Sequence, residues 1–170
     1  ILVVGDLMLD RWVEGTVSRM SPEAACPVFV PTTHEWVAPG GAANVARILS
    51  DSGLSVATGG VIACDEDGVV LTNLLRTVGV DTSAVWRQGA FTTSKKRFIT
   101  PDGRHIMRLD RDCPTPLPDE MVHILIDKMR TGVSALVISD YSKGVVSAEA
   151  ASRLLTEAAR MGIPSIVDIK

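Results

Sequence analysis

Carboxylates follow three apolar runs in this sequence, at places where they could bind a polar ligand. Asp6 and Asp10 come just after the run at residues 1–4, while Asp140 and Asp168 each directly follow a later run. A carboxylate can accept hydrogen bonds from paired sugar hydroxyls. Because ligands collect at the carboxyl ends of parallel strands, several such residues indicate a polar cleft. Any one of them could instead be an ordinary turn residue or helix cap.

A glycine pair precedes an asparagine in the stretch "PGGAANVARILSDSG", residues 39–53. Gly40 and Gly41 permit close backbone approach or a positive φ, and the helix that follows begins with unpaired N–H groups. Asn44 can both donate and accept hydrogen bonds. The stretch therefore predicts a binding corner. The alternative is a tight turn that only joins a strand to a helix.

Basic residues alternate along the segment at residues 91–110, "FTTSKKRFITPDGRHIMRLD". If this segment is two strands around the turn "PDG", Lys95 and Arg97 point the same way and Arg108 lies on the partner strand. Two or three cations on one face suit a phosphate group. A solvated edge strand protected by lysine is the competing interpretation.

These residues need a scaffold, and the pattern of the chain predicts an α/β fold. Apolar runs that read as buried strands alternate with helical patterns at residues 42–52, 65–79 and 147–162, and a further helix ends near Gly132. Asp67 and Ser147 are candidate N-caps for two of these helices. The order predicts a doubly wound, mainly parallel sheet.

Two segments do not fit this sheet. Residues 11–38 and 91–110 have mixed polarity and partial alternation with period 2, which is typical of strands with one exposed face. We expect them to form a small β-sheet lid at the edge of the main sheet, because they share one pattern and adjoin loops that leave core strands.

Composition excludes several classes of function. Seventeen basic residues against twenty acidic ones, with 4% aromatic residues, argue against nucleic-acid binding. No apolar run is long enough to span a membrane. Three isolated cysteines without metal-ligand spacing fit a reducing cytoplasm and predict no metal site in this chain.

Several stretches together resemble the ribokinase or PfkB carbohydrate kinase family, most closely its branch of bacterial D-glycero-β-D-manno-heptose-7-phosphate kinases. In chain order they are "VVGDLMLDRW", "SRMSPEAACPV", "PGGAANVA", "TTSKKRF", "RLD", "SDYSKG" and "VDIK". The likeness covers essentially all 170 residues. It implies a ribokinase-like fold and phosphorylation of the anomeric hydroxyl of heptose 7-phosphate by ATP with Mg²⁺, on the route to ADP-heptose for lipopolysaccharide.

The resemblance also implies roles for particular residues. The sugar would be held by Asp10, Gly40, Gly41 and Asn44, and its 7-phosphate by Lys95 and Arg97, with Arg108 as a further candidate. Asp140, Lys143, Asp168 and Lys170 would lie toward the phosphoryl-transfer side of the cleft. A homodimer through the lid sheet is expected, because lid sheets commonly pack together in this family.

The family's second signature, which holds the catalytic base, lies beyond residue 170. We therefore expect residues 1–170 to be the N-terminal, sugar-binding portion of a kinase domain, with no catalytic residue of its own and no turnover alone. Two alternatives remain open. One is a kinase of the same family for another sugar, of the fructose or ribose type. The other is a non-catalytic sugar-binding or oligomerisation module.

Overall fold

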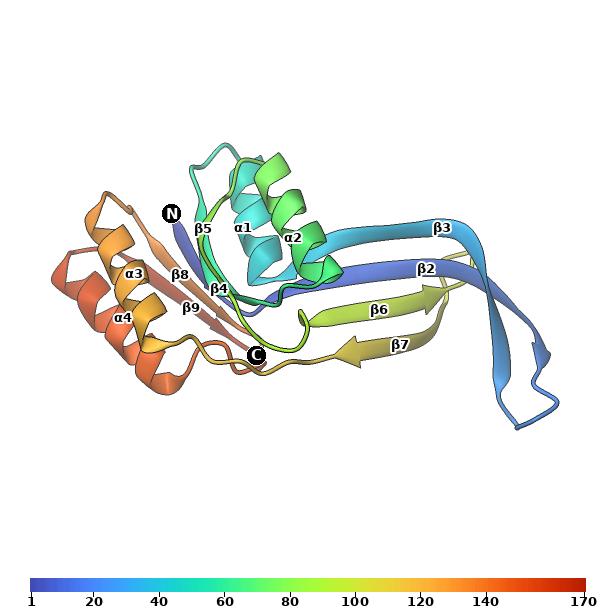
Figure 1. Cartoon of the computed structure of the whole chain (residues 1–170). Helices are drawn as coiled ribbons and strands as arrows, with labels where there is room; N and C mark the ends of the chain where they lie inside the picture. The colour runs from blue at the N-terminus through green and yellow to red at the C-terminus, as the bar shows by residue number, and fades with distance from the viewer.

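The computed structural model describes all residues 1–170 and has two parts, a body and a lid (Figure 1). The body is a parallel sheet of order β5-β4-β1-β8-β9. Its strands are β1 (Leu2–Gly5), β4 (Ala57–Ile62), β5 (Asp81–Arg87), β8 (Leu136–Asp140) and β9 (Ser165–Ile169). Its helices are α1 (Ala42–Asp51), α2 (Glu66–Thr77), α3 (Asp119–Arg130) and α4 (Ala148–Arg160).

Helices cover both faces of this sheet, α1 and α2 on one side and α3 and α4 on the other (Figure 1). Successive residues of a strand point to opposite faces, so the central strand β1 contributes to two apolar clusters. Leu2 and Val4 pack in one cluster with Leu125 of α3, whereas Val3 packs in the other with Leu71 of α2. The predicted doubly wound parallel sheet is confirmed.

The lid is a second sheet of order β3-β2-β6-β7 that extends from the body (Figure 1). Its strands are β2 (Leu7–Met20), β3 (Pro27–Gly41), β6 (Ser94–Ile99) and β7 (His105–Arg111). The two segments predicted as a lid do pair with each other, through the parallel contact of β2 with β6. Both β2 and β3 continue into the body beyond the predicted bounds of residues 11–38, which ties the lid to the end of β1.

The sequence interpretation needs revision at two strands and one helix cap. Strand β4 was not predicted because a glycine pair interrupts its apolar residues, and the edge strand β5 was not predicted because it opens with polar residues and lacks a continuous apolar run. The N-cap of α2 is Asp65 and not Asp67. Asp67 lies in the first turn of α2, where its carboxylate pairs with Arg11 of the lid.

No helix of the structure is long and apolar enough to cross a membrane.

Asp65 connects α2 to the strand that returns into the lid. Its Oδ1 accepts hydrogen bonds from Gly68 N at 2.9 Å and Thr92 Oγ1 at 2.6 Å, and its Oδ2 accepts from Thr92 N at 2.9 Å. Partial burial opposes ionisation, but the hydrogen bonds from Thr92 and Gly68 outweigh it and lower the pKa of Asp65. The carboxylate therefore stabilises both the helix start and the base of β6.

We expect Asp65→Ala to lower the free energy of unfolding by about 2 kcal/mol near neutral pH, because a helix cap and the Thr92 contacts are lost together. Urea unfolding would measure this. Since the folded pKa is lowered, the contribution is present above the ordinary carboxyl pKa and disappears as pH falls through the folded pKa. Glu66→Ala, an exposed change in the same turn, is the control and should cost less than about 0.5 kcal/mol. An equal loss in both variants would contradict this role.

Candidate functional site

Asp10 lies against the backbone of Gly40, where the lid joins the body. It occupies β2 and faces Ala38 of β3 in the strand register. A Cβ placed on Gly40 would lie 2.5 Å from Asp10 Oδ2 and 2.9 Å from Met8 Cγ. Only glycine leaves room for the carboxylate to lean across β3 at this point, so Gly40 serves close approach, one of the two roles that the sequence predicted.

The second glycine serves backbone conformation. Gly41 has a φ of 56° and precedes α1, and a Cβ there would collide with the backbone oxygen of Asp6. The first turn of α1 then presents Asn44. Its Oδ1 accepts from the Arg47 side chain at 3.0 and 3.3 Å, which leaves the amide hydrogens of Asn44 available to a ligand. At the predicted corner, glycine backbone thus lies beside the Asp10 carboxylate, and the first turn of α1 presents the amide hydrogens of Asn44.

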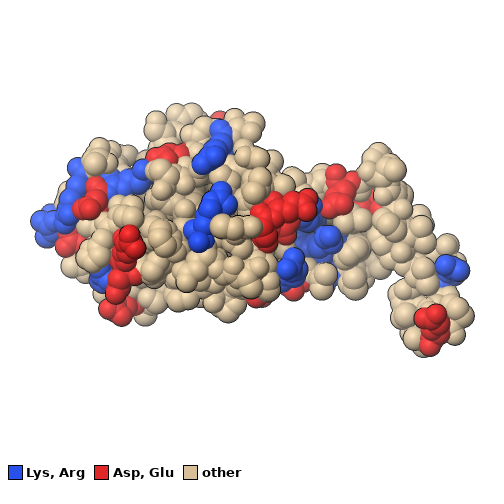
Figure 2. Space-filling view, viewed as in Figure 1, with Lys and Arg blue, Asp and Glu red and all other residues tan.

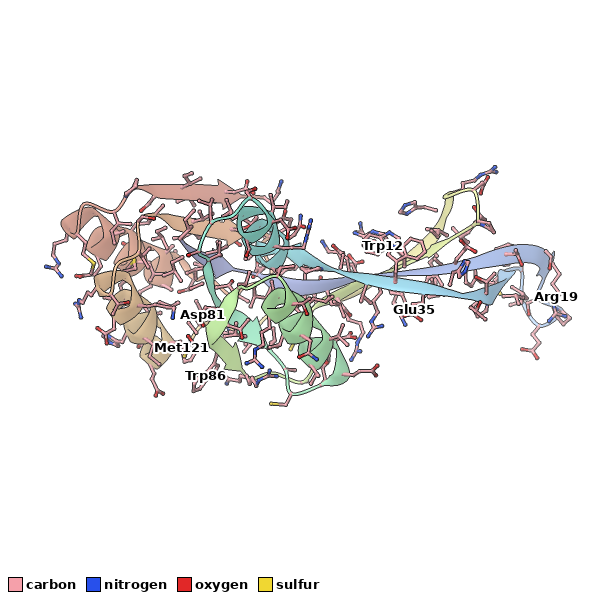
Figure 3. The ribbon with its side chains drawn as sticks, turned by 90° about the horizontal axis from the view of Figure 1, so that it is seen from above. Trp12, Arg19, Glu35, Asp81, Trp86 and Met121 are labelled. Atoms are coloured by element: carbon pink, nitrogen blue, oxygen red, sulfur yellow. The ribbon has the colours of Figure 1, made fainter.

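Arg97 reaches the same corner from β6. Its Nη1 donates to Asp10 Oδ1 at 2.8 Å, and both side chains are only 18% exposed. The guanidinium also lies 4.9 Å from the ring centroid of Trp12, which stacks on Trp36 at 5.9 Å. Figure 3 shows Trp12 partway along the lid, well short of Arg19 near its far end. The structure therefore unites Asp10 with Arg97, which sequence reasoning had assigned to different ligand groups.

Lys95 belongs to this face of the lid as well, since it is the register partner of Asp10. Its ammonium lies 5.7 Å from the ring of Tyr141, which follows β8. Lys170, after β9, lies 5.4 Å from the same ring. Neither ammonium has a carboxylate partner. The face of the lid that carries Asp10 is therefore turned toward the carboxyl ends of β8 and β9.

Asp6 holds the loop that carries Tyr141. Its side chain is 1% exposed and accepts backbone hydrogen bonds from Tyr141 at 2.7 Å, Lys143 at 3.1 Å and Val145 at 3.1 Å. Burial raises the pKa of Asp6, although the three backbone donors act in the opposite direction. This strand-end carboxylate thus has a structural role, the alternative that the sequence left open.

The other predicted residues either have partners within the protein or are exposed. Asp140 Oδ1 accepts from Ser142 N at 2.8 Å, as in an ordinary turn. Lys143 Nζ bonds Asp112 at 2.7 Å, and Asp168 is exposed on β9. Arg108 is the register partner of Arg97 but pairs with Asp110 of its own strand at 2.8 Å.

Sequence reasoning missed the aromatic residues of the site. Trp12 lies two residues after Asp10, and this spacing alone places both side chains on one face of a strand. Tyr141 stands inside the quoted stretch "SDYSKG", but no pattern in the sequence indicated that two lysines distant along the chain would meet its ring. Such contacts depend on the packing of the lid against the body.

The largest cavity, about 510 Å³, lies on the opposite face of the lid beside α2. Among its lining residues, Arg11 of β2 and Ser94 and Lys96 of β6 alternate along their strands with the residues of the site. The full lining is Arg11, Glu35, Glu66, Asp67, Ser94, Lys96, Leu109 and Arg111. Figure 2 shows acidic and basic side chains next to each other where the body joins the lid, without a broad basic surface. This cavity is distinct from the site around Asp10.

Comparison with known proteins assigns the chain to a family. The model for the pfkB family of carbohydrate kinases matches residues 1–161. The bifunctional protein HldE of Magnetococcus marinus is 39% identical over 178 residues, which cover all of this chain and 36% of HldE. HldE of Acidiphilium cryptum is 39% identical over 175 residues, again covering all of this chain and 35% of the relative. The chain spans about a third of the length of these relatives.

Solved structures agree on the fold. Arabidopsis thaliana ribokinase, complexed with ribose and ATP, superimposes with a TM-score of 0.71 at 16% identity, over 99% of this chain and 52% of the ribokinase. Phosphofructokinase-2 of Escherichia coli gives 0.68 at 22% identity, over 99% of this chain and 54% of that enzyme. On the family match and its extent, the chain belongs to the pfkB family of carbohydrate kinases.

Proposed function

We propose that this chain is the sugar-binding part of a kinase that phosphorylates the anomeric hydroxyl of D-glycero-β-D-manno-heptose 7-phosphate. The likeness to HldE proteins along the whole chain supports this branch of the family. The observation that carries the proposal is the placement of Asp10 against Gly40, with the uncompensated Lys95 beside it on the same face. A carboxylate for hydroxyls next to a cation for a phosphate suits a sugar phosphate.

The reaction would join the anomeric oxygen to the γ-phosphorus of ATP while the bond from that phosphorus to ADP breaks. The hydroxyl proton must pass to a base, and phosphoryl transfer depends largely on positioning and charge neutralisation. This chain would supply the positioning of the acceptor. Asp10 and the amide of Asn44 would bind its hydroxyls, while Lys95 would bind its phosphate.

ATP and Mg²⁺ are implied by the family. No group of three or more His, Cys, Asp or Glu side chains lies close enough together to hold a metal ion. Lys143 and Lys170 lie at the same sheet edge as the proposed acceptor site. We propose that the metal ligands and the catalytic base come from outside residues 1–170.

A coupled assay of ADP release tests the proposal. The complete protein should turn over heptose 7-phosphate in preference to fructose, ribose or their phosphates, while residues 1–170 alone should not turn over. Preference for fructose or ribose would favour the alternative kinases of the family. Tight binding of a sugar phosphate by residues 1–170, with no turnover by the complete protein, would favour a non-catalytic binding module.

Gly40→Ala should raise KM for the sugar by about tenfold or more, because the added Cβ displaces the Asp10 carboxylate. Gly40→Ala should lower the free energy of unfolding less than Gly41→Ala does. At Gly41 the added Cβ would collide with backbone and φ is positive. Gly103 also has a positive φ, but a Cβ there would meet no other atom. Gly103→Ala therefore shows the effect of backbone strain without a collision. A KM for Gly40→Ala equal to that of wild type would contradict the site.

We further propose that two copies pair through their lids. The lid exposes a series of large apolar side chains: Val17, Met20, Val30, Trp36, Ile106, Met107 and Leu109. Apolar surface of this kind marks association sites. Light scattering should give twice the monomer mass, and Met20→Asp together with Val30→Asp should shift the protein to monomer. A wild-type monomer at all concentrations would contradict this.

A further inference from the structure

The Arg97 guanidinium contacts protein groups on two sides, although the resemblance assigns this residue to the substrate phosphate. On one side its Nη1 bonds Asp10 Oδ1 at 2.8 Å. On the other its guanidinium lies on Trp12, its own register partner, at 4.9 Å. Trp12 is in turn nearly parallel to Trp36, with an interplanar angle of 5°. A planar guanidinium suits such a stack, whereas an ammonium does not.

The contact with Arg97 leaves one carboxylate oxygen of Asp10 without a hydrogen-bond donor. Arg97 engages Oδ1, and no protein group donates to Oδ2, which lies beside Gly40. With one oxygen fixed, the carboxylate has a single orientation in which the other oxygen can accept from a ligand. A short carboxylate side chain without this partner would sample other rotamers, and a misplaced acceptor costs binding energy.

The remaining cations on this face of the lid differ from Arg97. Arg108 pairs with Asp110. Lys95 has only the Tyr141 ring as a partner, and an aromatic ring attracts a cation without neutralising its charge. Lys170 meets the same ring. Positive charge that lacks a carboxylate is thus concentrated around Tyr141 and not around Arg97.

We propose that Arg97 is a positioning residue for Asp10 and not a ligand of the substrate phosphate, and that the Trp36, Trp12 and Arg97 stack holds it in that role. Lys95 is then the lid cation that determines preference for a phosphorylated acceptor. This inference rests on the proposed function and assigns separate tasks within its site. Hydroxyl recognition belongs to Asp10 with Arg97, and phosphate recognition belongs to Lys95.

The test uses the complete protein, ADP release, and two acceptors, heptose 7-phosphate and the same heptose without its phosphate. Arg97→Met should lower kcat/KM for both acceptors by a similar factor, about tenfold or more, mainly through KM. Lys95→Met should lower it for the phosphorylated acceptor at least about tenfold more than for the other. Trp12→Leu should reproduce the Arg97→Met pattern more weakly. Arg104→Met, at the exposed lid turn, should match wild type.

A double-mutant cycle separates positioning from direct contact. If Arg97 acts through Asp10, Arg97→Met should add less than about threefold to the loss already caused by Asp10→Asn. Additive losses, or a loss in Arg97→Met confined to the phosphorylated acceptor, would overturn the inference while leaving the proposed function intact. Absence of turnover by the wild-type protein with either acceptor would overturn the proposed function, and this inference with it.

Discussion

Replacing Asp10 with alanine is expected to lower kcat/KM for the sugar by about a hundredfold to a thousandfold, the largest functional effect of any single change in this chain. Two losses coincide. The sugar hydroxyls lose a charged acceptor, and Arg97, only 18% exposed, loses the carboxylate that balances its charge. Steady-state kinetics with heptose 7-phosphate would measure the effect, and Asp10→Asn should fall between wild type and alanine.

The control for this change is Asp102→Asn, which alters an exposed carboxylate in the turn between β6 and β7 and should leave kcat/KM within about twofold of wild type. Circular dichroism must show that Asp10→Ala keeps the fold. A folded Asp10→Ala protein with wild-type kcat/KM would refute the assignment of this corner as the acceptor site.

Replacing Asp6 with alanine is expected to produce the largest loss of stability, about 3 kcal/mol or more in the free energy of unfolding. Three backbone N–H groups, those of Tyr141, Lys143 and Val145, would lose their acceptor. Asp6 is almost fully buried, so few water molecules can replace the carboxylate. Urea unfolding would measure the loss, and the loop that carries Tyr141 should exchange its amide hydrogens faster.

The stability that Asp6 contributes should depend on pH. Because burial raises the folded pKa of Asp6 above its ordinary value of 3.8, folding favours the protonated group. Its contribution is fully present below the unfolded pKa and declines as pH rises through the folded pKa. The stability gap between wild type and Asp6→Ala should therefore be wider at low pH than at pH 7. Asp168→Ala, an exposed strand-end change, should show neither effect, and equal losses in both variants would contradict the role of Asp6.

The helices of the body and its strands β1, β8 and β9 were predictable from sequence because their signals are local. Periodic apolar residues, the helix end near Gly132 and the serine cap at Ser147 each act within a few neighbouring residues, and the structure confirms them. The lid was predictable for the same reason, because polar and apolar residues alternate with period 2 along strands that have one exposed face. The error at Asp67 arose because Asp65 and Asp67 can both cap a helix, and only the contact with Thr92 decides between them.

The sequence indicated where the candidate residues would gather in the fold, but not which of them would pair. Strand ends and a glycine pair indicate an edge of the sheet, and alternation places Lys95 and Arg97 on one face. The sequence could not show that Arg97 would bond Asp10, 87 residues away, while Lys95 turned to Tyr141. Those choices follow from the register between β2 and β6, which depends on how the whole lid packs.

A crystal structure of the protein with heptose 7-phosphate tests the central claim most directly, because the two faces of the lid offer different places for the ligand. We predict that sugar hydroxyls lie within hydrogen-bond distance of Asp10 and Asn44, with the phosphate beside Lys95. A ligand in the cavity on the opposite face, between Asp67 and Arg111, would contradict the account.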